Sequence, residues 1–178
     1  QKSLGLDSRD KAKTFIYAYI YSAGNERISE ILNISVSEAK RIREKFEKAI
    51  PALKNLKQAV AIKYRNQKWI YGLDKRKLMC RAEFSSLNTL IQSAGALLVK
   101  AGTIIINNDL VKEGFKWGED YRMVLHVHDE IQFVVLKNKI EKFKEIANRL
   151  FDKTQQYFNF KCPLAGEIKV GYNWSGTH

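Results

Sequence analysis

The sequence is poor in the residues that cross-link small proteins. Only two of its 178 residues are cysteine, Cys80 and Cys162, and they lie far apart without a Cys-x-x-Cys pair. This spacing argues against a zinc ribbon or a disulfide scaffold. It favours two buried free thiols in a reducing compartment.

Long apolar runs are absent as well. The longest run, near residues 104–106, ends in Asn-Asn-Asp and falls short of the ~18 residues that span a bilayer. Residues 1–3 do not begin an apolar signal segment, and the missing initiator Met indicates a trimmed, processed or excised chain. We therefore expect a cytoplasmic protein with no membrane partner.

Charge of one sign dominates the composition. The formal net charge is +12, and the excess is largest in residues 1–66, where 14 Lys and Arg accompany 7 Asp and Glu. Such an excess favours a polyanionic partner, either nucleic acid or an anionic membrane. The alternative is a basic surface that only confers solubility.

Local signals predict a helical first part. Ser8, which follows Asp7, is suited to cap a helix over residues 9–21. Ser35 and Glu38 have the spacing of a capping box for the helix that ends near residue 49. Two further helices are expected at residues 26–32 and from residue 51 onward.

The pattern changes near residue 67. It predicts, in order, a hairpin near 69–80, a helix over 88–111, a hairpin over 121–136, a helix over 140–158 and a strand over 167–172. We therefore expect an α+β fold. Residues 1–66 would form a helical subdomain, and residues 67–178 a small antiparallel sheet backed by helices.

A first candidate site lies on the first helix, where Arg9, Lys13, Tyr17 and Tyr21 recur at every fourth position. Each step of four residues turns about 40° around a helix, so the four side chains share a stripe of about 120°. Guanidinium and ammonium groups match successive phosphates of a triphosphate, and aromatic rings can pack on a sugar and base. The alternative is a solvated basic helix. The opposite side carries residues that can be buried, namely Ala12, Phe15, Ile16 and Tyr19.

A second candidate site is His128-Asp129-Glu130, at the expected tip of a hairpin. Adjacent carboxylates between apolar strands are costly unless they are paired or bind a metal, and their hard oxygen ligands suit Mg²⁺. Side chains alternate along a strand, so only one of the two can point to a given face. The alternatives are an ordinary polar turn, or a phosphohydrolase or transition-metal site with His126. The latter would need more ligands than three histidines supply.

A third group is formed by Asn88 and Gln92, one turn apart on one helix face. Amide side chains there can contact base edges or the sugar–phosphate backbone. The alternative is helix packing and capping.

Together the three groups resemble the family A DNA polymerases, the class of bacterial DNA polymerase I, and most of all those of short-tailed phages. The resemblance is carried by RDKAKTFIY (9–17), WIYGLD (69–74), LNTLIQSAGA (87–96), VHDEI (127–131) and GYNW (171–174). These blocks follow the family's order with fitting spacing. Residues 1–66 would be the fingers and residues 67–178 the C-terminal palm of a template-directed DNA polymerase.

The resemblance implies roles in nucleotide binding. Arg9 and Lys13 would hold the deoxynucleoside triphosphate, with Lys13 also acting in catalysis. Tyr17 would face the sugar, where a tyrosine is associated with acceptance of dideoxynucleotides. Tyr21 would stack near the template base.

The resemblance also implies a Mg²⁺ pair as cofactor and primer–template DNA as partner. Asp129 would bind the metal pair with help from Glu130, and His128 would lie near the primer 3′ end. The residues that contact primer–template near the new base pair would be Arg81, Asn88 and Gln92, together with His128.

Four positions depart from the family's pattern. Ser22 follows Tyr21 where the family usually has Gly, and Ala18 and Lys75 also stand where Gly is common. Phe84 occupies a position that other members fill with a polar or basic residue. These changes bear on helix-end flexibility and fine DNA contacts, and not on the fold.

In the family, the second metal-binding Asp lies upstream of the fingers, as do the thumb and the exonuclease. Asp7 lacks the motif that surrounds that Asp. We therefore expect the chain alone to be inactive and to need the missing N-terminal portion. It would be an excised domain, an incomplete reading frame or one subunit of a split polymerase, in the host cytoplasm if phage-encoded. A basic DNA-binding module without catalysis is the alternative.

Overall fold

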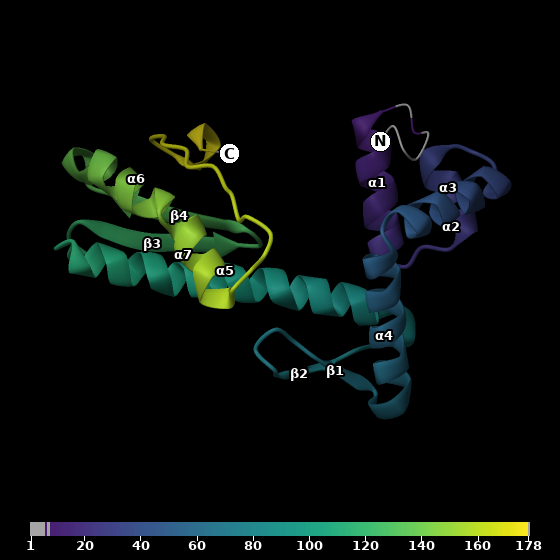
Figure 1. Ribbon diagram of the computed structural model, residues 1–178. Coiled ribbons are helices and arrows are strands. Elements are labelled where there is room, and N and C mark those ends of the chain that lie inside the picture. Colours follow the sequence, from purple (N-terminus) through teal and green to yellow (C-terminus); the bar gives the residue numbers. More distant parts are fainter. Residues whose placement is uncertain (1–5, 7, 178) are drawn as a thin grey trace. The chain divides into compact units, whose positions relative to one another are not determined.

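The computed structural model describes residue 6 and residues 8–177. The chain forms two compact units, Gln1–Ala94 and Gly95–His178, and the division falls inside the long helix α5 (Ser86–Lys112). The functional boundary expected near residue 67 stays a prediction, because compact units need not coincide with functional subdomains. Figure 1 labels the elements of each unit.

The first unit is mainly helical. Its elements are α1 (Arg9–Ile20), α2 (Asn25–Leu32), α3 (Val36–Ala49), α4 (Pro51–Gln67), β1 (Trp69–Tyr71), β2 (Lys77–Met79), a 3₁₀ turn (Glu83–Ser85) and the start of α5. The Ser8 hydroxyl accepts a hydrogen bond from Lys11 N at 3.1 Å, and the Ser35 hydroxyl accepts one from Glu38 N at 3.2 Å. Both predicted serine caps are therefore present. Asp7, the other residue of the expected first cap, lies outside the described residues.

Aromatic rings from α1 and α3 form the core of the first unit. Phe15 and Tyr19 meet the Phe46 ring edge-on, at centroid distances of 5.2 and 5.0 Å. Ile28 and Ile42 close the core from α2 and α3. Ile16, expected on the buried side, is 37% exposed. The reason is that it lies at the edge of the buried face formed by its neighbours on α1.

The second unit packs a hairpin and two helices on the C-terminal part of α5. Its elements are β3 (Tyr121–Val127), β4 (Glu130–Val135), a 3₁₀ turn (Lys137–Lys139), α6 (Ile140–Asn148), α7 (Leu150–Phe158) and a 3₁₀ turn (Trp174–Gly176). β3 and β4 are antiparallel, with an irregularity between Met123 and Leu125. Leu110, Tyr121 and Phe143 are central to the core that joins α5, the hairpin and α6. The predicted α+β fold class is confirmed.

Three local expectations were wrong. The single helix over 140–158 is divided into α6 and α7 at Arg149. Residues 167–172 adopt no strand, because in the described part of the chain β3 and β4 pair only with each other. Cys162 is exposed and Cys80 is half-buried, so the two free thiols are not both core residues.

One helical segment, Glu83–Lys112, is long and apolar enough to cross a membrane by length and composition alone. Its apolar residues do not form one continuous run, because Asn88, Gln92 and Lys100 interrupt them. One such helix is weak evidence, since core helices of soluble proteins meet the same criteria.

Two of the positions where the family commonly has Gly have left-handed backbone. Ser22 has φ 60° and Lys75 has φ 63°, a region that costs a side-chain-bearing residue about 1 kcal/mol. The buried Ser22 hydroxyl oxygen also has no hydrogen-bond partner among the described residues. We expect Ser22→Gly to raise the free energy of unfolding by about 1 kcal/mol and Lys75→Gly by a few tenths to about 1 kcal/mol, measured by urea denaturation.

Ala18→Gly is the matched control, since Ala18 is also a position where Gly is common but lies within the helix α1. Glycine there should destabilise the fold by about 0.5–1 kcal/mol. The same sign of effect at all three positions would contradict the backbone explanation.

Candidate nucleotide-binding and catalytic sites

The stripe on α1 is exposed, as its spacing predicts. Arg9 and Lys13 face solvent, and Tyr17 and Tyr21 are 53% and 50% exposed. The Lys13 ammonium lies 5.9 Å from the centroid of the Tyr17 ring. The opposite face is anchored in the core through Phe15 and Tyr19. The helix thus presents two cations and two aromatic rings on one accessible face, while its opposite face is packed in the core.

The end of α1 is held by three charged residues that the sequence analysis did not single out. The Lys57 ammonium, from α4, lies 4.5 Å from the Tyr19 ring centroid and donates to the Tyr19 carbonyl oxygen at 3.4 Å. Arg43, from α3, donates to the Ala23 carbonyl oxygen. The Tyr19 hydroxyl donates to Glu47 at 3.3 Å. Cations at a helix C-terminus stabilise its unpaired carbonyl groups, so this cluster fixes the end that carries Tyr21.

The cluster changes the pKa of two of its members. Burial, and then the Glu47 carboxylate, raise the pKa of Tyr19 to about 12. Burial, and then Arg43, lower the pKa of Lys57, although Glu47 opposes this. Both shifts follow from placing ionisable groups in a poorly hydrated environment.

The raised pKa of Tyr19 predicts a loss of stability in alkali. Below the unfolded pKa of about 10 the phenol is neutral in both states, whereas between pH 10 and 12 it ionises only on unfolding. The free energy of unfolding should therefore fall as pH rises through this window, by on the order of 1 kcal/mol. Lys57 has the opposite effect on stability. Because its folded pKa is lowered, its contribution to the free energy of unfolding increases as pH rises toward its unfolded pKa of about 10.5.

Tyr19→Phe isolates the tyrosine contribution. Urea denaturation at pH 9 and pH 11 should show a steeper decline for the wild type than for this variant, which keeps Lys57. Equal declines in the two proteins would contradict the assignment.

The α1 stripe is joined to the start of α5. The Gln92 amide donates to the Tyr21 hydroxyl oxygen at 2.9 Å. Asn88 is half-buried, and its side-chain amide oxygen Oδ1 has no hydrogen-bond partner among the described residues. Arg81 is exposed in the segment after β2. Gln92 and Tyr21 are therefore in direct contact, a pairing that their distance in the sequence does not indicate.

The second candidate site lies at the tip of the β3–β4 hairpin in the other unit. Val127 pairs with Glu130, so His128 and Asp129 form a two-residue turn. His128 has left-handed backbone, with φ 52°. Non-glycine residues in this region are uncommon and concentrate at functional sites. Asp129 is exposed, and within the described residues its side chain makes no hydrogen bond or ion pair.

Glu130 is in a different environment from Asp129. Its Oε1 accepts hydrogen bonds from the Gln132 amide and from the Trp174 indole, the latter at 3.2 Å. The two adjacent carboxylates are thus in different environments: Glu130 accepts hydrogen bonds at the start of β4, whereas Asp129 faces solvent from the turn.

The donor set does not complete a metal site within the described residues. They contain no group of three or more His, Cys, Asp or Glu side chains placed to hold an ion. The His126 and His128 alternative therefore lacks ligands as well. Carboxylate oxygens suit Mg²⁺, but Asp129 offers only part of an octahedral shell, and further ligands must come from elsewhere.

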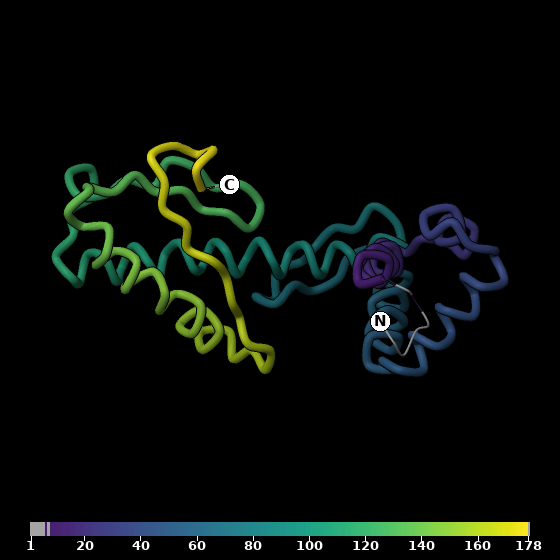
Figure 2. Tube along the Cα trace, turned by 90° about the horizontal axis from the view of Figure 1, so that it is seen from above, coloured from purple at the N-terminus to yellow at the C-terminus, as the bar shows by residue number. Residues whose placement is uncertain are grey.

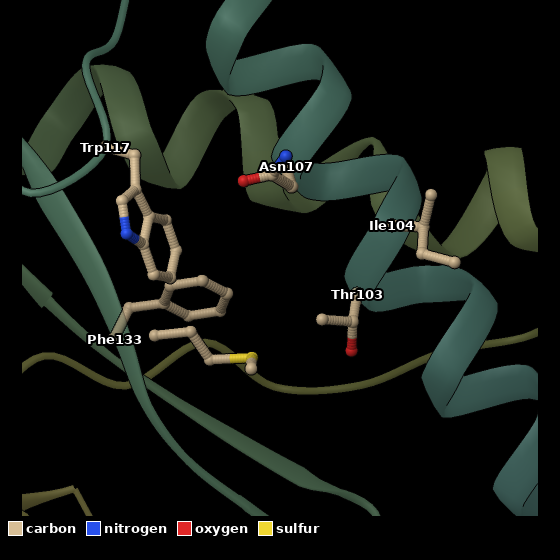
Figure 3. A pocket seen from close by; sticks show the side chains of 6 residues that line it. Thr103, Ile104, Asn107, Trp117 and Phe133 are labelled. Carbon is tan, nitrogen blue, oxygen red and sulfur yellow. The ribbon is translucent and has the colours of Figure 1, made fainter.

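One hollow in the second unit was not predicted. It has a volume of about 260 Å³ and is lined by Thr103, Ile104, Asn107, Trp117, Met123 and Phe133. Figure 3 shows the Trp117 and Phe133 rings facing α5 side chains across it. The Asn107 side-chain oxygen accepts from the Tyr121 hydroxyl at 2.7 Å. With no titratable side chain in its wall, the hollow has no means of acid–base chemistry.

Comparisons with known proteins find a family model, sequence relatives and a solved structure that are similar to this chain. A family model described as DNA polymerase family A matches residues 2–176. The DNA-directed DNA polymerase of Enterobacteria phage T3 is 35% identical over 196 residues, covering 100% of this chain and 28% of the relative. That of Escherichia phage T7 is 35% identical over 191 residues, covering 97% and 27%. The chain therefore spans less than a third of these relatives.

A solved structure supports the same fold. It is described as the POL domain of Pol1 from M. smegmatis in complex with DNA primer-template and dNTP. It matches with a TM-score of 0.82 at 20% identity, covering 95% of this chain and 31% of that chain.

Proposed function

This chain belongs to the family A DNA polymerases, and we propose that it supplies the nucleotide-binding helix and one catalytic carboxylate of a template-directed DNA polymerase. The observation that carries the proposal is the exposed stripe on α1, in which two cations are followed by two tyrosines. The reaction joins the α-phosphorus of a deoxynucleoside triphosphate to the primer 3′ oxygen and releases pyrophosphate.

On α1, Arg9 and Lys13 bind the phosphates of the incoming nucleotide. Their charges neutralise the leaving pyrophosphate, and the planar guanidinium can donate two parallel hydrogen bonds. Tyr17 packs on the sugar, and Tyr21 lies beside the template base. Because Gln92 donates to Tyr21, the contact with the template base and the contact with the DNA on α5 are coupled.

On the hairpin, Asp129 is the metal-binding carboxylate, and His128 lies near the primer end. Arg81, Asn88 and Gln92 contact primer–template DNA. Family A DNA polymerases use divalent metal ions, typically Mg²⁺. In a two-metal site these would activate the attacking oxygen and stabilise the leaving one.

The remaining ligands would come from the rest of the polymerase, either in the same polypeptide or in a second subunit. The chain's partners are then the N-terminal portion of the polymerase, primer–template DNA and deoxynucleoside triphosphates. It would act in the cytoplasm. A second candidate is a basic DNA-binding module without catalysis, which the net charge of +12 favours.

Single-nucleotide primer extension with Mg²⁺ distinguishes the two candidates. We expect no extension by this chain alone, and extension after addition of an upstream palm segment from a related polymerase. A chain that binds DNA in a salt-dependent way, but extends no primer with any such segment, would favour the binding module. Extension by the chain alone would show that it holds a second carboxylate ligand.

A further inference from the structure

The C-terminal segment returns to the hairpin tip after α7. α7 ends at Phe158, where Asn159 has left-handed backbone, and residues 160–173 form neither helix nor strand. Figure 2 shows this segment, in yellow, crossing α5 and ending beside the β3–β4 hairpin. Ile168 packs on the core of the second unit along the way.

The end of this segment folds tightly on itself. The Asn173 side chain accepts from Gly176 N at 3.0 Å and so caps the Trp174–Gly176 turn. A Cβ atom at Gly171 would lie 2.9 Å from the carbonyl carbon of Gly176, closer than real Cβ contacts. Glycine at 171 is therefore required for the turn that presents Trp174.

Hydrogen bonds link this turn to β4 and also order the side chains within β4. The Trp174 indole N–H donates to Glu130 Oε1 at 3.2 Å, and the Gln132 amide donates to the same oxygen. The Thr177 hydroxyl donates to the Trp174 backbone carbonyl oxygen at 3.0 Å, and its oxygen lies 3.4 Å from the Gln132 side-chain oxygen. The Gln132 amide nitrogen is thus directed at Glu130, because that carboxylate is its acceptor.

We infer that Trp174 is a positioning residue that, with Gln132, holds the Glu130 carboxylate on the C-terminal segment and leaves Asp129 as the carboxylate presented at the tip. The inference rests on the proposed function and refines it, because Glu130 then orders the tip instead of binding the metal. Hydrogen bonds to an ionised acceptor are stronger than neutral ones, so the bridge restrains the first residue of β4. Restraint there also restrains the turn that carries Asp129, in the way that outer-shell partners orient a metal ligand.

Amide hydrogen exchange without DNA or nucleotide tests the bridge itself. Trp174→Phe and Glu130→Ala should each accelerate exchange at Gly176 and Thr177 by about tenfold, and the double variant should exchange no faster than either. Trp117→Phe, which removes another exposed indole of the same unit, should leave these amides unchanged. Unaltered exchange in Trp174→Phe, or additive effects, would overturn the inference.

Complemented primer extension tests the functional consequence. Trp174→Phe should lower kcat by on the order of tenfold while the KM for the nucleotide stays within about twofold, because the nucleotide-binding stripe is untouched. A fall in kcat/KM that arises entirely from KM would contradict positioning. If the wild type fails to extend with any upstream segment, the proposed function fails, whereas the exchange result still decides whether the bridge exists.

Discussion

Asp129→Asn should reduce complemented primer extension by on the order of 10³-fold or more while leaving the fold intact. Phosphoryl transfer depends on groups that position the reactants and neutralise developing charge. Asparagine keeps the size of the side chain but removes the negative charge that binds a hard cation. Because Asp129 is exposed and makes no hydrogen bond or ion pair within the described residues, its replacement removes no structural contact. Initial rates of single-nucleotide incorporation measure the effect.

Asp152→Asn is the matched control. Asp152 is an exposed acid on α7 in the same unit, and its replacement changes the net charge equally. Activity should remain within about twofold of the wild type, as expected for an exposed substitution away from the site. Equal losses in the two variants would indicate a general charge effect and would reject Asp129 as the catalytic carboxylate.

Phe15→Ala should have the largest effect on stability, lowering the free energy of unfolding of the first unit by about 3–5 kcal/mol. Phe15 is fully buried, and its ring packs against Tyr19 and Phe46. Truncation leaves a cavity at the centre of the core that anchors α1. Urea denaturation followed by circular dichroism measures the loss.

Phe84→Ala provides the comparison, since Phe84 is 68% exposed. It should change the free energy of unfolding by no more than about 0.5 kcal/mol. A small effect at Phe15 would mean that α1 is not anchored through its aromatic face. The rigid stripe proposed for nucleotide binding would then lose its physical basis.

Local sequence patterns were sufficient for the helices of the first unit, for both hairpins and for the exposed stripe. Helical periodicity placed Arg9, Lys13, Tyr17 and Tyr21 on one accessible face, because a regular helix repeats every 3.6 residues whatever surrounds it. The serine caps at Ser8 and Ser35 are likewise formed with residues three positions away.

The same patterns were insufficient where elements meet distant partners. The helix break at Arg149 and the absence of a strand over 167–172 depend on how these segments pack and pair with other parts of the same chain. The positions of Ser22 and Lys75 were recognised as unusual, but only the backbone showed why glycine would suit them.

The sequence by itself thus determined the fold class, the family and the chemical character of the exposed stripe and the acidic tip. Only the tertiary structure decided which distant side chains hydrogen-bond to these sites. Lys57 donates to the Tyr19 carbonyl oxygen at the end of α1, Gln92 donates to Tyr21, and Trp174 donates to Glu130. These pairs are separated by 38, 71 and 44 residues, respectively. Periodicity and capping report on neighbours within one or two turns, whereas contacts at such separations exist only after the elements have packed together.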